Sequence, residues 1–293
     1  MPHILQNKNL EIHIDLPDEN YKASRFDRTG KIVKVKFHNV LLSSVERTDR
    51  ENEDHFGKGF YNEFGIDTAL GFDEAEIGGW FHKIGVGLLK KENNEYLFSK
   101  NYETKPAEFN SILESDRVLM SCKSESVNGY SYVLKKEIEL YENEFRIKYY
   151  LQNTGKKEIV TNEYSHNFIA INKELIGSNY LLKFPFALKP ERFEETVNPE
   201  RKVDIGQNEI KFKGTPKEQF FFSNLSANET IDAAWELVNL TNNIRIRETG
   251  SFQTNKVKLW GWKHVISPEL FVNLHIKPGQ SAEWTRTYHV SEV

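Results

Sequence analysis

The sequence has one cysteine, no long hydrophobic run and no excess of charge of one sign. Because Cys122 stands alone, the chain can form neither an internal disulfide nor a zinc site built from several cysteines. No apolar stretch approaches the length of a membrane span, and the first residues lack the apolar core of a secretory signal. We therefore expect a cytoplasmic protein without a membrane partner.

The balance of charge and the glycine pattern exclude further classes of protein. The 39 basic and 43 acidic residues give a net charge of −4, whereas nucleic-acid binding depends on clustered positive charge, so we expect no nucleic-acid partner. Residues 78–87 are glycine-rich but lack the spacing, preceding strand and following helix of a dinucleotide-binding loop, and we interpret them as a long irregular loop. The absence of a fixed repeat and of a long amphipathic helix excludes a propeller and an α/β domain.

Short β-strands are predicted along most of the chain, because apolar and polar residues alternate in many segments. Residues 10–16, 31–37 and 40–45 have this pattern and are interpreted as an N-terminal meander. From residue 96 onward strand signals recur about every ten residues. Three groups of turn residues between these strands are interpreted as hairpin connections: Asn128-Gly129, Glu142-Asn143 and Asn153-Thr154-Gly155.

Aromatic residues supply the hydrophobic core of the predicted fold. The 20 Phe, 12 Tyr and 5 Trp can bury a large area without disulfide support. The fold class that follows is all-β, a large antiparallel β-sandwich of about 15 to 20 strands. We expect a single domain over residues 1–293 that is a monomer or a homodimer.

One histidine lies in a segment that otherwise has the pattern of a buried strand, residues 159–171. A period of two places Tyr164, His166 and Phe168 on one face and the odd-numbered residues, including Asn167, on the other. A histidine in this position is more often a core residue bonded to the backbone than a catalytic group. The segment alone does not decide between these interpretations.

A second unusual stretch lies about a hundred residues later, again on a predicted strand. Trp260 and Trp262 share a strand face, where indole rings can stack on a sugar, although two tryptophans on one face more often belong to the core. Glu269 stands between apolar residues after Pro268. It is either a solvated turn residue or a half-buried carboxylate with a shifted pKa.

Taken in order, several segments resemble the galactose mutarotase-like superfamily, which contains the aldose 1-epimerases and their sugar-phosphate epimerase relatives. The matching segments, spread over most of the chain, are Leu151-Gln152-Asn153-Thr154-Gly155, Tyr164-Ser165-His166-Asn167-Phe168, Ile176-Gly177, Tyr180, Phe184-Pro185-Phe186, Trp260-Gly261-Trp262, Ser267-Pro268-Glu269-Leu270-Phe271, Lys277-Pro278-Gly279, Trp284 and Tyr288. The resemblance implies a β-supersandwich that binds a small-molecule carbohydrate and acts on it without a metal or other cofactor.

The resemblance also implies roles for two residues. His166 would be the general acid toward the ring oxygen of a sugar, and Glu269 the general base on the anomeric hydroxyl. Together they would interconvert the α and β anomers by opening and closing the ring. We expect the two side chains on opposite sides of the ring, roughly 5 to 9 Å apart.

Six further residues are candidates for substrate binding: His82, Arg25, Trp262, Lys263, Glu63 and Asn167. His82 lies in the region where galactose mutarotases carry an earlier histidine and a Gly-Arg loop, but its local context differs, so galactose itself is not implied. Arg25 resembles an arginine of a subgroup and could bind hydroxyls or a phosphate, or it is a surface charge. Two alternatives stay open: a carbohydrate-binding protein without activity, and a lyase or hydrolase that uses Glu63 with Glu269.

Overall fold

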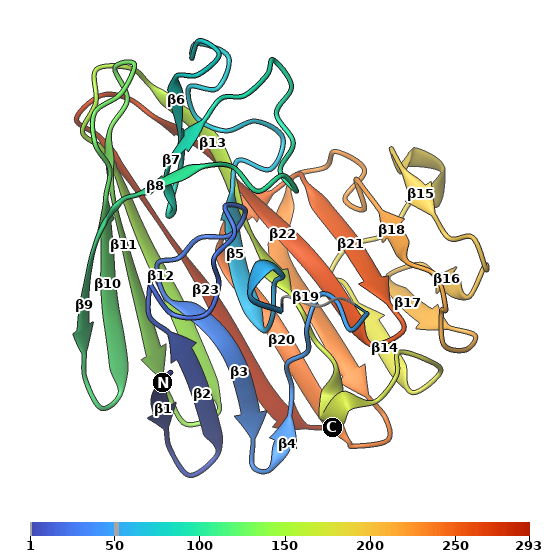
Figure 1. Ribbon diagram of the computed structural model, residues 1–293. Helices are drawn as coiled ribbons and strands as arrows, with labels where there is room; N and C mark the ends of the chain where they lie inside the picture. Colours follow the sequence, from blue (N-terminus) through green and yellow to red (C-terminus); the bar gives the residue numbers. More distant parts are fainter. Residues whose placement is uncertain (1, 50–52) are drawn as a thin grey trace.

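Strands dominate the computed structural model, which describes residues 2–49 and 53–293 (Figure 1). In chain order the strands are β1 (His3–Gln6), β2 (Leu10–Asp15), β3 (Lys31–Phe37), β4 (Val40–Leu41), β5 (Phe60–Phe64), β6 (Trp80–Lys83), β7 (Gly87–Lys90), β8 (Thr104–Pro106), β9 (Glu108–Leu113), β10 (Arg117–Lys123), β11 (Tyr132–Leu140), β12 (Glu144–Asn153), β13 (Ile159–Asn167), β14 (Tyr180–Lys183), β15 (Thr196–Val197), β16 (Val203–Ile205), β17 (Glu209–Phe212), β18 (Phe220–Phe222), β19 (Ile231–Asn239), β20 (Ile244–Thr254), β21 (Val257–Trp262), β22 (Val265–Ile276) and β23 (Ser281–Glu292). Three short 3₁₀ helices connect some of them: η1 (Glu53–His55), η2 (Ile171–Lys173) and η3 (Pro190–Arg192).

The strands form two large antiparallel sheets and a small three-stranded sheet (Figure 1). The first large sheet has the order β1-β2-β3-β5-β13-β22-β21-β18-β15, with β4 paired to β3. The second has the order β16-β17-β14-β19-β20-β23-β12-β11-β10-β9, and β6, β7 and β8 form the small sheet. This arrangement confirms the predicted all-β antiparallel sandwich. The described residues form 23 strands, more than expected, because pairs as short as β4 and β15 count among them.

The core lies between the two large sheets and follows from alternation along each strand. In β12 every second residue, from Phe145 to Leu151, is buried, while the residues between them are partly exposed. Strand β13 differs, since its last five residues are all buried. One connected cluster of buried apolar side chains includes residues from Leu5 to Val290, so both ends of the chain contribute to it.

A buried charge network joins the two large sheets. The Arg286 guanidinium of β23 lies 2.7 Å from Glu163 of β13 and 2.6 Å from Glu248 of β20, and none of the three side chains is exposed. Two indole N–H groups complete it, since Trp284 donates to Glu163 and Trp235 to Glu248. Such a network costs desolvation energy, but losing one partner would leave a buried charge uncompensated, so it fixes how the sheets face each other.

Two of the predicted hairpins are confirmed and one is wrong. The turns at Asn128-Gly129 and Glu142-Asn143 connect paired strands, β10 to β11 and β11 to β12. The turn at Asn153 does not, because β12 belongs to the second large sheet and β13 to the first. The Asn153 amide donates to the carbonyls of Lys157 and Ile276. The residues therefore form a turn, but the turn carries the chain from one sheet to the other.

The glycine-rich stretch is also different from the expected irregular loop. Residues 80–83 and 87–90 pair as β6 and β7 around a turn in which Gly85 has a positive φ of 79°. Their alternation is hidden in the sequence because nearly all of these residues are buried. None of the helices in the part of the chain that the structure describes has the length and hydrophobicity that a bilayer crossing requires.

Candidate active site

His166 and Glu269 meet on neighbouring strands of the first large sheet. Strands β13 and β22 pair with Tyr164 opposite Phe271, and continuing this register places His166 opposite Glu269. The imidazole Nε2 lies 3.4 Å from the carboxylate Oε1. The expected 5 to 9 Å separation across a sugar ring is therefore wrong, because directly opposite residues of an antiparallel pair project side by side from one face.

Ser267 connects the two side chains through its hydroxyl group. Its Oγ lies 2.8 Å from His166 Nδ1 and 3.3 Å from Glu269 Oε1. A serine hydroxyl donates only one hydrogen, so it can donate to one of these groups while it accepts from the other. The orientation of Ser267 therefore follows the protonation of both members of the His166–Glu269 pair.

Burial tunes the protonation of the His166–Glu269 pair in opposite senses. The two residues are 4% and 3% exposed. Burial raises the pKa of Glu269 to about 7, against the opposing effect of the nearby cations Lys258 and Arg25. Burial and the Arg25 charge hold the pKa of His166 well below its ordinary value. Near neutral pH the imidazole is uncharged and Glu269 exchanges a proton readily, which suits acid–base chemistry.

Arg25 and Glu63 lie beside the pair in a second charge network. Arg25 Nε is 2.8 Å from Glu63, its Nη1 is 3.0 Å from Glu46, and its Nη2 donates to the Tyr164 hydroxyl. The Tyr164 ring lies 6.0 Å from that of His166. Arg25 is thus not the surface charge of the alternative interpretation, because its side chain is only 14% exposed.

Glu63 is held in its charged form by two cations. Lys83 Nζ lies 3.0 Å from Glu63, opposite the Arg25 contact. Burial alone would raise the pKa of Glu63, but Lys83 and Arg25 keep it below its ordinary value. A carboxylate fixed in this way is a poor proton donor, which disfavours a hydrolase that would use Glu63 with Glu269.

The structure does not bring the other predicted residues onto the pair. Asn167 faces the second sheet, where its amide donates to Glu248 of β20 at 3.0 Å, and the same amide donates to the Pro268 carbonyl of β22 at 2.7 Å. His82 is buried against Tyr130 and Tyr132, and neither of its ring nitrogens has a hydrogen-bond partner among the described residues.

Trp262 and Lys263 lie farther along the same face. The Trp262 indole donates to the Lys217 carbonyl at 2.7 Å, and Lys263 Nζ lies 5.2 Å above the Trp262 ring. Trp260 instead borders the pair, with its ring 5.3 Å from that of His166. The sequence did not indicate that Trp260 is a neighbour of His166, although a period of two places Trp260 and Trp262 on the same face of their strand.

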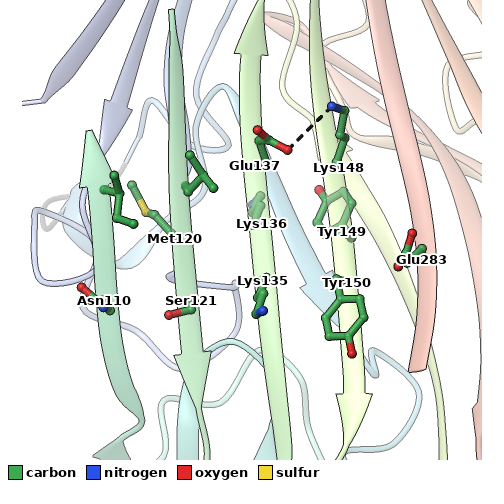
Figure 2. Close-up of a pocket in the computed structure, with 12 residues that line it drawn as sticks. Asn110, Met120, Ser121, Lys135, Lys136, Glu137, Lys148, Tyr149, Tyr150 and Glu283 are labelled. Carbon is green, nitrogen blue, oxygen red and sulfur yellow. Dashed lines mark ion pairs between the residues drawn. The ribbon is translucent and has the colours of Figure 1, made fainter. Parts of the chain in front are cut away.

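Aromatic rings pack around His166, and a large hollow of the surface lies elsewhere. Phe168 stacks on His166 at 4.0 Å between ring centres, and Phe26 lies edge-on at 6.1 Å. A hollow of about 490 Å³ lies on the second sheet beside Tyr150 and Lys135 (Figure 2). Neither His166 nor Glu269 is among the residues that line this hollow.

No cluster of three or more histidine, cysteine, aspartate or glutamate side chains arranged to hold a metal ion occurs within residues 2–49 and 53–293. The arrangement at His166 and Glu269 offers instead two groups that exchange protons and a hydroxyl between them.

Comparison with known proteins shows the fold. No protein-family model matches the chain, and none of the curated proteins does. A galactose mutarotase-like protein from Lactobacillus casei superposes with a TM-score of 0.60 at 11% identity, covering 99% of this chain and 100% of that one. One from Clostridium acetobutylicum gives 0.58 at 14% identity, covering 99% and 95%. An aldose epimerase homologue from C. elegans gives 0.51 at 10%, with full coverage of both chains. The chain has the galactose mutarotase-like fold.

Proposed function

We propose that this protein is an aldose 1-epimerase-like isomerase that interconverts the α and β anomers of a sugar or sugar derivative. The observation that carries the proposal is the 3.4 Å contact between His166 and Glu269, on one face of the sheet and tuned by burial. Proteins of this fold that are described as mutarotase-like or as aldose epimerase homologues support the choice of reaction.

The chemistry of anomer exchange fits an acid and a base that stand side by side. When the ring opens, the C1 hydroxyl loses its proton, the bond from C1 to the ring oxygen breaks, and that oxygen gains a proton. The two oxygens are bonded to the same carbon, so groups on one side of the sugar can reach both. Rotation about the bond between C1 and C2, followed by the reverse transfers, gives the other anomer, and no proton is consumed.

The proton that this exchange needs is shared between His166 and Glu269. The roles that the resemblance implies, His166 as acid and Glu269 as base, require the proton on the imidazole, whereas burial favours it on the Glu269 carboxyl of the free protein. The contact between them and the Ser267 hydroxyl provide short paths for its transfer. One member accepts the C1 hydroxyl proton while the other donates to the ring oxygen, and ring closure exchanges the two roles.

Proton NMR of freshly dissolved α-anomers tests the proposal. The protein should equilibrate at least one hexose or hexose derivative faster than buffer does. His166→Ala and Glu269→Gln should each lower this rate by about a hundredfold to ten-thousandfold, the usual contribution of a positioned acid or base. Glu283→Gln, at the hollow on the second sheet, is the matched control and should keep the rate. Equal rates for all the proteins would refute the assignment of the pair.

A carbohydrate-binding protein without activity is the second candidate. The observation that favours it is the burial of His166 and Glu269, which are 4% and 3% exposed. Binding of a sugar that is measurable by calorimetry, with no acceleration of anomer exchange, would select this candidate. The cytoplasmic location, the single domain over residues 1–293 and the monomeric or homodimeric state stay predictions.

A further inference from the structure

A polar hollow of about 300 Å³ lies on the first large sheet and includes Lys258, the cross-strand neighbour of Glu269. It is lined by Glu194, Ser223, Asn224, Asn228, Asn255, Lys256, Lys258 and Asn273. Strands β21 and β22 pair with Lys258 opposite Glu269, and Trp260 opposite Ser267. Side chains of directly opposite residues point to the same face, so Lys258 both lines the hollow and stands beside the catalytic carboxylate.

The two lysines of the hollow differ in how their charge is balanced. Lys256 Nζ lies 2.6 Å from Asp67, so its charge is paired. Lys258 is half-buried, and no residue within 2–49 or 53–293 forms an ion pair or a hydrogen bond with its ammonium group. Its contacts there are with two aromatic rings, Phe221 at 5.8 Å and Phe271 at 5.2 Å.

The remaining lining groups are suited to a polar, negatively charged ligand. The lining also has the Ser223 hydroxyl and four asparagine amides, although Asn224 is bonded to Arg192 and Asn228, and Asn273 donates to Asn255. Glu194 is the one carboxylate among the lining residues that the structure describes, and it is exposed and not in ion-pair contact with Lys258. Lys258 therefore has no ion-pair partner among the described residues, while the Asp67 and Glu269 carboxylates interact with its charge from a longer distance.

We infer that this hollow binds the anionic group of a charged sugar, a phosphate or a carboxylate, with Lys258 as its ion-pair partner. The inference deepens the proposed function and rests on it, because it places the C1 end of the same sugar at His166 and Glu269. Opposite residues on antiparallel strands have Cβ atoms about 5 Å apart. One monosaccharide can therefore contact Glu269 at its reacting end and Lys258 with a substituent.

Steady-state kinetics of anomer exchange test the inference on the full chain. The substrates are D-glucose and D-galactose, their 6-phosphates, and the matching uronic acids. Lys258→Met should raise the KM of the anionic sugars about tenfold or more relative to the KM of the neutral sugars, since a hydrogen bond to a charged group is lost. Lys258→Arg should restore most of the affinity because it keeps the charge.

The control variant is Lys213→Met, which removes an exposed lysine that pairs with Asp204 away from the hollow. It should leave every KM unchanged. The anionic series with the lower KM identifies the group, phosphate or carboxylate. Equal KM values for neutral and anionic sugars, or a Lys258→Met effect on KM of the same size for both, would overturn the inference while leaving the isomerase proposal intact.

If no sugar is turned over, the isomerase proposal fails and binding decides the inference separately. Calorimetry with glucose 6-phosphate, glucuronate and glucose would then compare the unmodified protein with Lys258→Met. Binding of an anionic sugar that is lost in Lys258→Met supports the hollow as an anion site. The absence of such binding, or binding that does not depend on Lys258, overturns it.

Discussion

Replacing Glu269 by glutamine is expected to change how the stability of the protein depends on pH. Burial raises the pKa of this carboxyl from 4.5 to about 7 in the folded state, whereas in the unfolded chain it titrates near the ordinary value. Between these values the folded state binds more protons than the unfolded state, so the free energy of unfolding falls as the pH rises. Glutamine has no proton to lose, and the variant lacks this fall.

The size of the effect follows from the difference between the two pKa values. From 4.5 to about 7 is about 2.5 units, and at about 1.4 kcal/mol per unit this gives about 3 kcal/mol. The ionised carboxylate of the folded protein costs this amount because it is 3% exposed, with its nearest cations too far away to pair with it. Most of the change lies between pH 5 and pH 8.

Urea unfolding at pH 5 and pH 8 measures the effect. The free energy of unfolding of Glu269→Gln minus that of the unmodified protein should be about 2 to 3 kcal/mol larger at pH 8 than at pH 5. Glu200→Gln is the control, since a bond from Lys202 lowers the pKa of Glu200 to about 2 and its titration ends below pH 5. If Glu269→Gln shows the same difference from the unmodified protein at both pH values, burial does not destabilise the carboxylate and the reasoning is refuted.

Two further substitutions test the hydroxyl bridge and the charge network. Ser267→Ala should lower the rate of anomer exchange about tenfold while the circular dichroism spectrum stays the same, because the hydrogen bond that orients His166 Nδ1 is lost; an unchanged rate would exclude a role for the bridge. Arg286→Met leaves Glu163 and Glu248 buried without a cation, and should lower the free energy of unfolding by about 3 to 5 kcal/mol in urea titrations. A loss below 1 kcal/mol would contradict the assigned network.

Local alternation along single strands was sufficient to predict the fold class. The period of two in residues 31–37 corresponds to β3, and the turn at Asn128-Gly129 to a true hairpin. It could not show that the chain crosses between sheets at Asn153, because the same turn residues serve both connections. Nor could it reveal β6 and β7, where burial on both faces removes the alternation.

The candidate site was predictable in part, for a related reason. Alternation placed His166 with Tyr164 and Phe168, and the structure keeps these side chains together on one face. Their relation to Glu269 depends on the register of β13 against β22, which is a property of two segments about a hundred residues apart. Ser267 lies two residues before Glu269 on β22, and the register of β21 against β22 brings in Lys258; neither residue type is distinctive enough in the sequence to be singled out.

Side chains from both large sheets bind the strand that carries Glu269. Asn167 donates to the carbonyl of Pro268 and Arg286 to that of Leu270, so the peptide groups on both sides of Glu269 are bonded from the core. Pro268 has no N–H to contribute to a ladder, so these side-chain bonds add to the pairing of β22 with β21. Arg286 thus connects the charge network to the residue after Glu269, and we expect changes in β23 to act on the site without touching it.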